Sequence, residues 1–381
     1  MHPRTSGFLE ESNLDGFLFV GDSISDADMY YLSHFLAGDR FALLVKEKTT
    51  LLVTSMEKGR AKKESLADEV ICTSEYGFSK KLAECGKPDE AYLQVLQEFL
   101  RDHGVMRLGV PFRFPAGIFQ HLCRDFEVTI LESPVSRERE VKTQAEKTAI
   151  QLTQKACERA MKLATKLIAN SESCGDILYR HGQPLTSEQV RSQIEVSLLE
   201  DGCEAVDTIV AGGASGADPH ARGSGPLLAN APIVIDIFPR SKSSRYFADM
   251  TRTVLKGESP LEVKEIYEAV ALAQTKGILA IRAGVSGNEV HSHVVSVFQE
   301  LGYPERESSG FTHSTGHGVG LEVHERPHLG EFGETLRTDQ VVTVEPGLYY
   351  PNIGGVRLED LVVVTETGCE NLTHFEKKLV L

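Results

Sequence analysis

The stretch that decides the fold is His313-Ser-Thr-Gly-His317-Gly-Val-Gly-Leu-Glu-Val-His324-Glu325. The chain has 13 histidines among 381 residues, and four of them, His313, His317, His324 and His328, fall within or just after this stretch. Each interspersed glycine loses backbone entropy on folding, so the stretch has poor intrinsic order. Glycine also lets a backbone come close to a ligand, and imidazole is the commonest metal-ligating side chain. The alternatives are a metal-binding segment and a glycine-rich loop with surface histidines.

Four acidic residues lie inside or at the end of strand-like apolar runs. They are Asp236 in Ile-Val-Ile-Asp-Ile, Asp249 in Ala-Asp-Met-Thr-Arg-Thr-Val, Glu345 after Val-Val-Thr-Val, and Glu359 in Val-Arg-Leu-Glu-Asp-Leu-Val. A carboxylate among buried apolar residues is costly unless it is paired or coordinates a metal. One such acid is typical of a salt-bridged core residue. Four of them beside a Gly-His-Gly segment predict a metal centre.

The chain resembles the pita-bread metallopeptidases, which include Xaa-Pro aminopeptidases, prolidases and methionine aminopeptidases. The resemblance rests on five potential ligands in the family's order, namely Asp236, Asp249, His317, Glu345 and Glu359. The surrounding motifs ADMTRT, GHGVGLEVHE, VEPGLY and RLEDLVVV match the family as well. One departure is the sequence spacing of Asp236 and Asp249, which is slightly longer than the family usually shows.

The resemblance implies two divalent metal ions, usually manganese, although cobalt or zinc also suits these ligands. Asp236 and Asp249 would hold one ion, and Asp249, His317, Glu345 and Glu359 would hold the other, so that Asp249 and Glu359 bridge. Two such ions hold a water as hydroxide between them. Glu345 is expected to carry the proton from this water to the leaving nitrogen, or else to serve as a ligand alone.

The same resemblance assigns catalytic roles to three histidines. His324 would donate to the developing oxyanion, while His220 and His313 would contact the substrate backbone. Arg357 precedes Glu359 by two positions, so it should face the same side of a strand and orient a ligand carboxylate. The other nearby polar residues are expected at the surface or outside the ligand set: His291, His293, His328, Glu322 and Glu325.

Residues 15–135 predict an α/β domain that has no catalytic constellation of its own. Strands are predicted at 16–20, 41–45, 50–53, 107–110 and 126–130, and helices at 91–101 and about 115–122. The motif SDADMYYLSHF at 25–35 resembles the start of the N-terminal domain of prolidases and Xaa-Pro aminopeptidases, although His34 stands where the family usually has glycine. The charged, turn-prone run Ser133-Pro-Val-Ser-Arg-Glu-Arg-Glu predicts the linker.

The predicted fold class is therefore an α/β N-terminal domain of creatinase/prolidase type (1–135), followed by an α+β pita-bread catalytic domain with pseudo-twofold halves (136–381). The catalytic domain should contain a long helix ending near residue 169, followed by helices at 174–181, 187–200, 261–282 and 289–301. Its second glycine-rich loop, at 210–225, lacks the following Lys-Ser/Thr and helix of a phosphate-binding loop, which excludes nucleotide binding. Asp236 and Asp249 should face each other across an antiparallel hairpin that turns between Lys242 and Ser243.

Composition and charge exclude several classes of protein. With 41% hydrophobic and 25% charged residues, the chain is typical of a soluble globular protein. The net charge of −15 disfavours nucleic acid and anionic membrane surfaces as partners. The N-terminal residues lack the apolar core of a signal peptide, and seven scattered cysteines predict reduced thiols, so a cytoplasmic location is expected. A homodimer is expected from the resemblance alone.

The function that these features predict is a dinuclear metal-dependent exopeptidase. It would hydrolyse peptides with proline at the second position, through a hydroxide that bridges the metals. The alternatives are a methionine aminopeptidase of the same fold, which usually lacks such an N-terminal domain, and a non-peptidase relative, either creatinase-like or a binding protein, which usually lacks the ligands. Dipeptides and longer peptides both stay open as substrates.

Overall fold

The computed structural model describes residues 3–304 and 309–381. The chain divides into two compact units, one that ends at Arg139 and one that starts at Glu140. This division falls at the end of the short helix α7 (Ser136–Arg139). The boundary predicted at residue 135 lies directly before the same helix.

In the described part of the first unit, six strands form one mixed sheet in the order β4-β3-β2-β1-β5-β6. The pairs β1–β2 and β2–β3 are antiparallel, whereas β1–β5, β5–β6 and β3–β4 are parallel. The strands are β1 (Gly16–Gly21), β2 (Phe41–Val45), β3 (Thr49–Val53), β4 (Glu69–Cys72), β5 (Arg107–Pro111) and β6 (Glu127–Leu131). The helices are α1 (Pro3–Glu11), α2 (Ala27–Ser33), α3 (Lys58–Glu64), η1 (Thr73–Tyr76), α4 (Phe78–Cys85), α5 (Pro88–Asp102), α6 (Ala116–Leu122) and α7.

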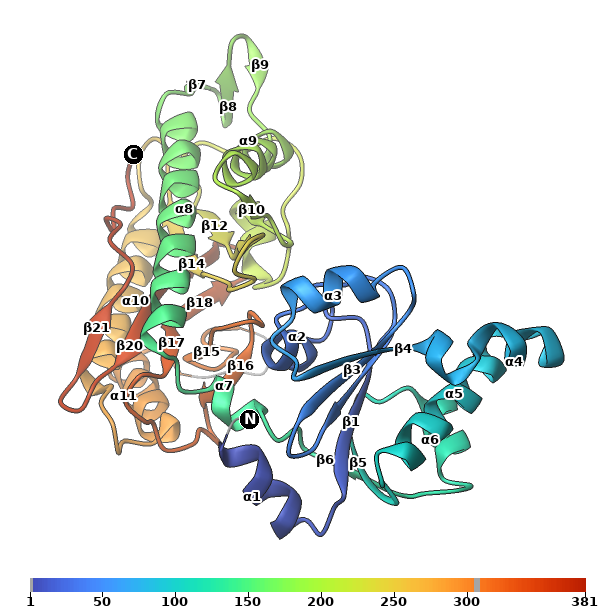
Figure 1. Ribbon diagram of the computed structural model, residues 1–381. Helices are drawn as coiled ribbons and strands as arrows, with labels where there is room; N and C mark the ends of the chain where they lie inside the picture. The colour runs from blue at the N-terminus through green and yellow to red at the C-terminus, as the bar shows by residue number, and fades with distance from the viewer. Residues whose placement is uncertain (1–2, 305–308) are drawn as a thin grey trace. The chain divides into compact units, whose positions relative to one another are not determined.

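Both faces of strands β1, β2 and β3 are buried, which explains why these strands are largely apolar. In β1, Leu18 and Val20 pack into a cluster with helix α5, while Phe17 and Phe19 pack into a second cluster on the other face. Figure 1 shows helices α2 and α3 apart from α5 and α6, with the sheet between them. Burial on two faces leaves little polar strand surface, and the unit is an α/β layer structure.

His34 ends helix α2 in a left-handed conformation. Its φ angle is 50° and its backbone N–H donates to the carbonyl of Tyr30. A helix commonly ends with such a residue, and glycine is the usual choice because it has no Cβ. The geometry therefore explains why glycine suits this position in related sequences, and His34 adopts the same backbone conformation.

In the described part of the second unit, two larger sheets carry the predicted ligands. One has the order β11-β12-β14 and the other the order β16-β15-β17-β20-β21. Their strands are β11 (Ile209–Gly212), β12 (Ile233–Ile237), β14 (Met250–Val254), β15 (Gly316–Gly318), β16 (Glu325–Leu329), β17 (Val341–Val344), β20 (Asp360–Val364) and β21 (Cys369–Asn371). Smaller pairings join β7 (Glu172–Cys174), β8 (Ile177–Arg180), β9 (Gln183–Pro184), β10 (Cys203–Glu204), β13 (Arg240–Ser241), β18 (Gly347–Tyr350) and β19 (Gly354–Arg357).

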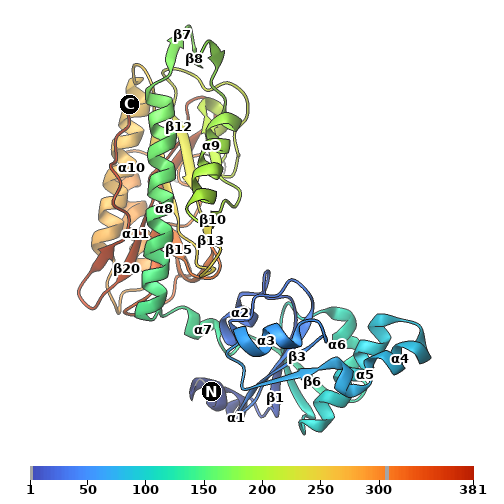
Figure 2. The ribbon, with the colours of Figure 1, turned by 45° about the horizontal axis from the view of Figure 1, so that its top comes forward.

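Each of these two sheets packs against its own pair of helices. Helices α8 (Gln144–Ala169) and α9 (Ser187–Glu200) share a core with β11, β12 and β14. Helices α10 (Leu261–Ala280) and α11 (Gly287–Glu300) lie against the strands of the second half. Figures 1 and 2 both show α8 beside α10, so the two helix pairs lie next to each other within this unit. The short 3-10 turn η2 (Gly213–Ala217) follows β11 in the second glycine-rich loop.

The helix predicted at 174–181 is wrong, because these residues form the hairpin β7–β8. Strand β7 ends at Cys174 and strand β8 runs from Ile177 to Arg180. Gly175, His181 and Gly182 all have left-handed φ angles, of 61°, 52° and 73°. A helix cannot continue through such positions, and the apolar residues between them fit a strand that is buried on one side.

The predicted register of the aspartate hairpin is also wrong, by two positions. Asp236 pairs with Thr251, and Asp249 lies directly before β14. The turn is displaced because Arg245, with φ 67°, takes the left-handed position and donates its backbone N–H to Ser241. Asp249 is two residues from Thr251, so side-chain alternation still places it on the same face as Asp236.

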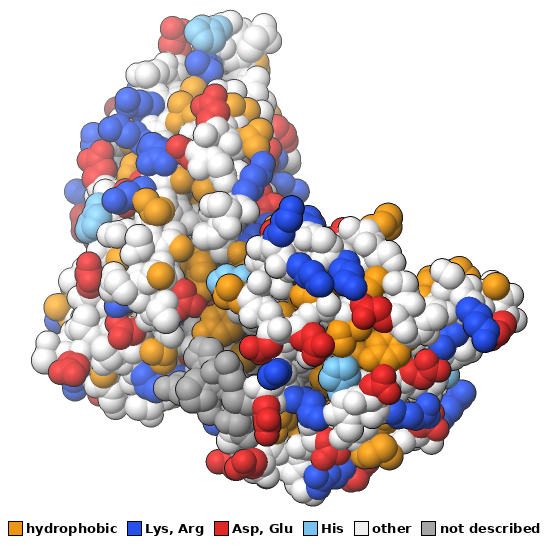
Figure 3. All heavy atoms as spheres, viewed as in Figure 1, with side chains coloured by type: hydrophobic (Ala, Val, Ile, Leu, Met, Phe, Trp, Pro, Cys, Tyr) orange, Lys and Arg blue, Asp and Glu red, His pale blue; other side chains and the backbone are white. Residues whose placement is uncertain are grey.

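The described residues show no long apolar helix and no disulfide. Within 3–304 and 309–381, no helix is both long enough and apolar enough to cross a membrane. All seven cysteines lie in this part of the chain and are free thiols. Figure 3 shows acidic and basic side chains interspersed over the face in view.

Candidate metal centre

The five predicted ligands come from strands of both halves of the second unit. Asp236 lies in β12, Asp249 precedes β14, His317 is the middle residue of β15, Glu345 follows β17, and Glu359 lies between β19 and β20. All five line one cavity of about 650 Å³. Strand ends and strand interiors hold these side chains on a scaffold of backbone hydrogen bonds, so their mutual positions depend on the fold rather than on a flexible loop.

Three of these side chains are close enough to share one metal ion. Ligand atoms of Asp249, His317 and Glu359 all lie within 4.8 Å of one another, and all three residues are buried. Nε2 of His317 is 3.9 Å from Oδ2 of Asp249 and 3.3 Å from Oε1 of Glu345. The structure thus brings Asp249 and Glu359 together, although they are more than 100 positions apart in the chain.

The orientation of His317 is set by its own strand and by the next one. Its backbone N–H donates to the hydroxyl of Thr343 at 3.0 Å. Its Nδ1 lies 3.1 Å from the carbonyl oxygen of Gly318, which can only accept, so Nδ1 is the donor. Nε2 faces the carboxylates. Without a metal it can carry a proton and donate to Glu345, which raises the pKa of His317, and it is the nitrogen that would bind an ion in place of that proton.

Glycines around His317 allow this close packing. A Cβ atom at Gly316 would lie 2.1 Å from the carbonyl oxygen of Thr343, and one at Gly318 would lie 2.2 Å from that of Arg326. At Gly320 a Cβ would meet the carboxylate of Glu325. The glycine pattern of the sequence is therefore explained by backbone contacts on both sides of β15 and by the side chain of Glu325 at Gly320.

Asp236 is joined to a polar chain that reaches the cavity wall. Its Oδ2 accepts from Arg357 at 2.7 Å, and Arg357 also donates to the hydroxyl groups of Thr251 at 3.1 Å and Tyr349 at 2.8 Å. The Tyr349 hydroxyl lies 2.9 Å from Nε2 of His313. Arg357 thus holds the Asp236 carboxylate in place, and Tyr349 connects Arg357 to His313.

The carboxylates of the site have opposite pKa shifts. Burial, together with the neighbouring carboxylates, raises the pKa values of Asp249 and Glu359 well above their ordinary range. Burial also raises the pKa of Asp236, despite the Arg357 charge. Burial alone would raise the pKa of Glu345, but the hydrogen bond and charge of His317 outweigh it and hold this pKa at about 2. The raised pKa values mean that, without metal ions, the cluster holds more carboxyl groups than its cationic neighbours can keep ionised.

The residues present fit divalent metal ions. Oδ1 of Asp236 is buried and has no hydrogen-bond partner among the described residues. Buried carboxylates that are not paired are expected to coordinate a metal, and a set of carboxylate oxygens with one imidazole suits hard or borderline divalent ions. The composition of the donor set, without any thiolate, matches this chemistry.

The predicted catalytic histidines lie in the wall of the same cavity, which is lined by His220, His313 and His324. The ring of His324 meets that of His317 edge-on, with centroids 4.2 Å apart and an interplanar angle of 85°. Burial lowers the pKa of His313, and burial with the charge of His317 lowers the pKa of His324. Both shifts favour the neutral imidazole, which carries one N–H. In His313 this N–H is on Nδ1, which lies 2.7 Å from the carbonyl oxygen of Ser314.

Two of the predicted surface histidines have further roles in the structure. His328 is exposed, yet it lines the cavity, while His293 is exposed on α11. The surface prediction is wrong for His291, which is half-buried, because it lies on the side of α11 that carries Val294 and Phe298. Its Nδ1 is 2.9 Å from the hydroxyl of Thr315, and its ring lies 5.5 Å from that of Phe311.

Several residues that hold the ligands were not predicted from the sequence. Gln154 of α8 is fully buried, accepts from the backbone N–H of Asp249 at 3.2 Å, and donates to its carbonyl at 3.1 Å. Thr251 donates its hydroxyl to Oε2 of Glu359 at 2.9 Å. The sequence does indicate that Gln154 has a structural role, because it lies within the apolar stripe of a long helix and a buried amide requires hydrogen-bond partners.

Two family models match the chain. The Creatinase/Prolidase N-terminal domain matches residues 3–141, and Metallopeptidase family M24 matches residues 144–366. An Xaa-Pro dipeptidase of Pyrococcus horikoshii is 30% identical over 378 residues, which cover 98% of this chain and 96% of the relative.

Solved structures show the same likeness. The prolidase from Pyrococcus horikoshii superposes with a TM-score of 0.81 at 28% identity and covers 98% of this chain and 97% of its own. An X-Pro aminopeptidase from Thermotoga maritima gives a TM-score of 0.80 at 28% identity, covering 97% and 98%. These matches confirm the predicted family and fold class, a creatinase/prolidase N-terminal domain followed by a pita-bread catalytic domain. The chain therefore belongs to metallopeptidase family M24 and is a metal-dependent peptidase.

Proposed function

We propose that this peptidase is a dinuclear exopeptidase that cleaves the bond between an N-terminal residue and proline. The observation that carries the proposal is the convergence of Asp249, His317 and Glu359 within 4.8 Å in a buried site. Asp236 and Glu345 line the same cavity. Support for proline specificity comes from the likeness to an Xaa-Pro dipeptidase, which extends over 98% of the chain.

In this proposal Asp236, Asp249 and Glu359 would hold one divalent ion, and Asp249, His317, Glu345 and Glu359 would hold the other. Asp249 and Glu359 would thus be shared between the two ions. A bound pair of divalent ions supplies Lewis acidity toward the scissile carbonyl and lowers the pKa of a coordinated water. Manganese is the proposed metal, on the basis of the family resemblance.

Glu345 is the proposed proton carrier. Its low pKa of about 2, which results from the hydrogen bond and charge of His317, keeps its carboxylate ionised at neutral pH. An ionised Oε atom can accept a proton from the attacking water and return it to the leaving nitrogen of proline. The charge of Arg357 also lowers the pKa of Glu345, and its Nη2 donates to Oδ2 of Asp236 at 2.7 Å.

His324 and His313 are proposed to act on the substrate. The neutral His324 imidazole, packed edge-on against His317, donates its N–H to the oxyanion that forms at the scissile carbonyl. His313 is oriented by the Tyr349 hydroxyl at 2.9 Å, and with His220 it contacts the substrate backbone. We further propose a homodimer, from the family resemblance, and a reducing cytoplasmic location, which suits the seven free thiols.

The test is a substrate comparison with manganese-loaded enzyme. Xaa-Pro dipeptides, Xaa-Pro-Yaa tripeptides or both should be hydrolysed, the matched Xaa-Ala peptides should be resistant, and a chelator should abolish turnover. Elemental analysis should give two metal ions per chain. Release of methionine from Met-Ala-Ser without any cleavage before proline would instead identify a methionine aminopeptidase, and turnover that survives complete metal removal would contradict the metal centre itself.

A further inference from the structure

A largely exposed segment outside the M24 match, in which only Thr373 is buried, is connected through buried side chains to two of the proposed ligands. This segment, Thr373–Lys377, is named here the brace. It follows β21, lies beyond residue 366 where the family match ends, and contributes none of the proposed ligands. Two separate sets of hydrogen bonds lead from the brace to the backbone on which Asp249 and Glu359 stand.

The first connection passes through Arg252, which is 1% exposed in β14. Its guanidinium uses all five N–H groups. Nη1 donates to the carbonyls of Glu359 at 2.6 Å and Thr251 at 2.9 Å. Nη2 donates to the carbonyl of Phe375 at 2.9 Å, and Nε donates to that of Glu376 at 3.2 Å. Arg252 thus ties the main chain of Glu359 directly to the brace.

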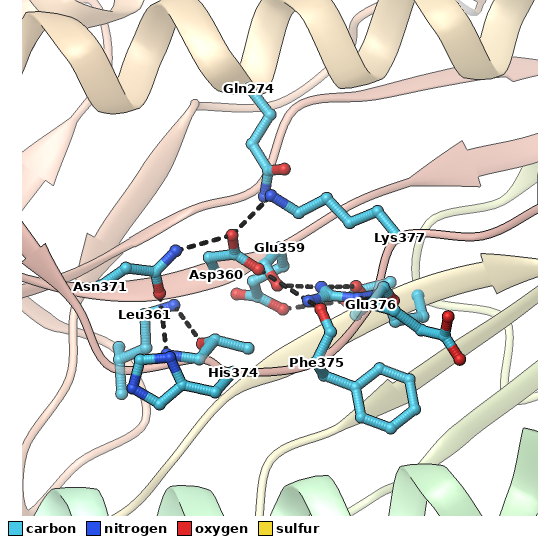
Figure 4. A network of polar contacts seen from close by, with 12 residues as sticks. Gln274, Glu359, Asp360, Leu361, Asn371, His374, Phe375, Glu376 and Lys377 are labelled. Carbon is cyan, nitrogen blue, oxygen red and sulfur yellow. Dashed lines mark hydrogen bonds and ion pairs between the residues drawn. The ribbon is translucent and has the colours of Figure 1, made fainter.

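The charge of Arg252 is balanced by Asp360. The remaining Nη2 hydrogen is donated to Oδ1 of Asp360 at 2.9 Å. Oδ2 of Asp360 is 2.6 Å from Nζ of Lys377 and accepts from Asn371 at 3.0 Å. Figure 4 shows Asp360 at the centre of this network, between Asn371 and the brace residues Phe375 to Lys377. Both charges are therefore buried with their hydrogen-bonding capacity filled, which is the condition for a buried ion pair to hold a fixed geometry.

The second connection passes through Thr373 and Gln154. The Thr373 hydroxyl oxygen accepts from Nε2 of Gln154 at 2.9 Å and from the backbone N–H of Leu361 at 2.9 Å. Gln154 in turn binds both the N–H and the carbonyl of Asp249. The same five-residue segment is therefore connected to Asp249 through one buried side chain and to Glu359 through another.

We propose that the brace is a positioning element that fixes the separation of Asp249 and Glu359. This inference rests on the proposed metal centre, in which these two carboxylates bridge the ions. Bridging carboxylates must be held within a few tenths of an ångström, and a ligand site depends on the groups that lock its first shell. The brace acts through Arg252, which binds it, and through its own Thr373, and neither side chain is among those that line the cavity.

The test measures metal affinity rather than activity. Wild-type protein and variants are stripped with a chelator, and Mn²⁺ is titrated while free ion is followed by electron paramagnetic resonance. Thr373→Val removes the hydroxyl acceptor at nearly constant volume and should weaken Mn²⁺ binding by roughly 10- to 100-fold, the usual effect of losing a partner that orients a ligand. Thr373→Ser keeps the oxygen and should restore wild-type affinity. Arg252→Lys, with three donors in place of five, should weaken binding at least as much as Thr373→Val.

Matched controls lie on the exposed side of α8. Thr148→Val removes a hydroxyl that binds only the carbonyl of Gln144, and Arg159→Lys alters a surface pair with Asp201. Both controls should bind Mn²⁺ like wild type. The unfolding temperature of each stripped protein separates general destabilisation from a loss of metal affinity, because Thr373→Val and Thr373→Ser should unfold within a few degrees of each other.

Three outcomes would overturn the inference. If Thr373→Val is folded and binds Mn²⁺ with wild-type affinity, the connection through Gln154 does not position Asp249. A loss of affinity in Thr373→Ser equal to that in Thr373→Val shows that the hydroxyl is not responsible. If wild-type protein itself does not bind Mn²⁺, the proposed metal centre fails, and the brace inference fails with it. If Arg252→Lys does not fold, the comparison of Thr373→Val with Thr373→Ser tests the inference without it.

Discussion

Glu359 and Asp360 are adjacent in the chain and equally buried, at 2% and 1% exposure, yet their surroundings are opposite. Asp360 has Arg252 on one carboxylate oxygen and Lys377 with Asn371 on the other. Glu359 accepts from Thr251, but the neighbouring charges of Glu345 and Asp236 add to burial and raise its pKa. Successive side chains of an extended segment point to opposite sides, so one carboxylate enters a balanced network and the next enters a surplus of negative charge.

This difference shows that burial of a charge does not by itself indicate a functional site. The network around Asp360 needs no added ion, because Arg252 and Lys377 both face its single carboxylate. The cluster around Glu359 has more carboxylates than cations, and in the proposed metal centre added cations would balance them. A buried carboxylate whose neighbours are other carboxylates is therefore the better indicator of a metal centre.

The largest expected effect comes from replacing each member of this pair by its amide. Glu359→Gln should abolish activity and reduce bound metal, but it should raise the unfolding temperature of the metal-stripped protein because it removes a repelled charge. Asp360→Asn should lower the stability of the stripped protein by about 3–5 kcal/mol, since it leaves Arg252 and Lys377 without a counter-charge. Urea unfolding of both variants after chelation measures whether their stabilities change in opposite directions relative to wild type.

Asp249→Asn serves as a second test of the same comparison and should behave like Glu359→Gln. The comparison fails if Glu359→Gln and Asp360→Asn destabilise the stripped protein equally. Near-normal turnover and metal content in Glu359→Gln or Asp249→Asn would show that these residues do not bridge the ions.

A smaller effect on activity is expected from replacing His324, whose ring packs against that of the proposed ligand His317. His324→Ala should lower kcat by roughly 10²–10³-fold, as expected for the loss of one oxyanion donor, with metal content unchanged. His317→Ala should lose metal as well as activity. The exposed His293 provides the control, since His293→Ala should change neither quantity. Loss of an ion from His324→Ala would place His324 among the ligands.

The smallest expected effect is the pH dependence of stability in the metal-stripped enzyme. The pKa values of Asp249 and Glu359 are raised above their ordinary values of 3.8 and 4.5. An acid whose folded pKa is raised favours the folded state when protonated, so this stability is lost as the pH rises from the ordinary pKa through the raised one. Glu345, with a pKa of about 2, has the opposite sign, but its contribution is lost only below its ordinary pKa of 4.5.

The histidines also make stability depend on pH, because their pKa values are shifted in both directions. Comparing wild type with Glu359→Gln separates the contribution of Glu359 from theirs. The free energy of unfolding of stripped Glu359→Gln, relative to stripped wild type, should increase by about 1 kcal/mol or more between about pH 5 and about pH 8. Urea denaturation at the two pH values measures this change. A constant difference would mean that Glu359 has an ordinary pKa in the folded protein.

The sequence was sufficient to predict the family, the fold class and the gathering of acids and histidines in one site. This success has a physical basis, because a carboxylate inside a β-branched run, such as Asp236, is rare without a reason. Short-range pattern also placed most strands and helices. It was misleading at 174–181, where apolar spacing resembled a helix turn and the left-handed positions at Gly175 and His181 were not taken into account.

Contacts between distant parts of the chain could not be predicted from the sequence. Arg252 in ADMTRT looks like one more polar residue of a strand, and nothing near it indicates that its partners are Glu359 and Phe375. The register of the aspartate hairpin depended on which residue of the turn takes a left-handed φ, and Arg245 is not a residue type that favours it. Gln154 and Tyr349 were missed for the same reason, since their partners lie on other elements.

The close packing of β15 also limits how this chain can vary by mutation. Every missense change of a glycine codon introduces a residue that has a Cβ atom. At Gly316 and Gly318 that atom would fall 2.1 Å and 2.2 Å from main-chain carbonyl oxygens, which no rotamer change can relieve. Alleles of intermediate activity are therefore not expected at these two codons, and a library of random variants should recover almost only synonymous changes there.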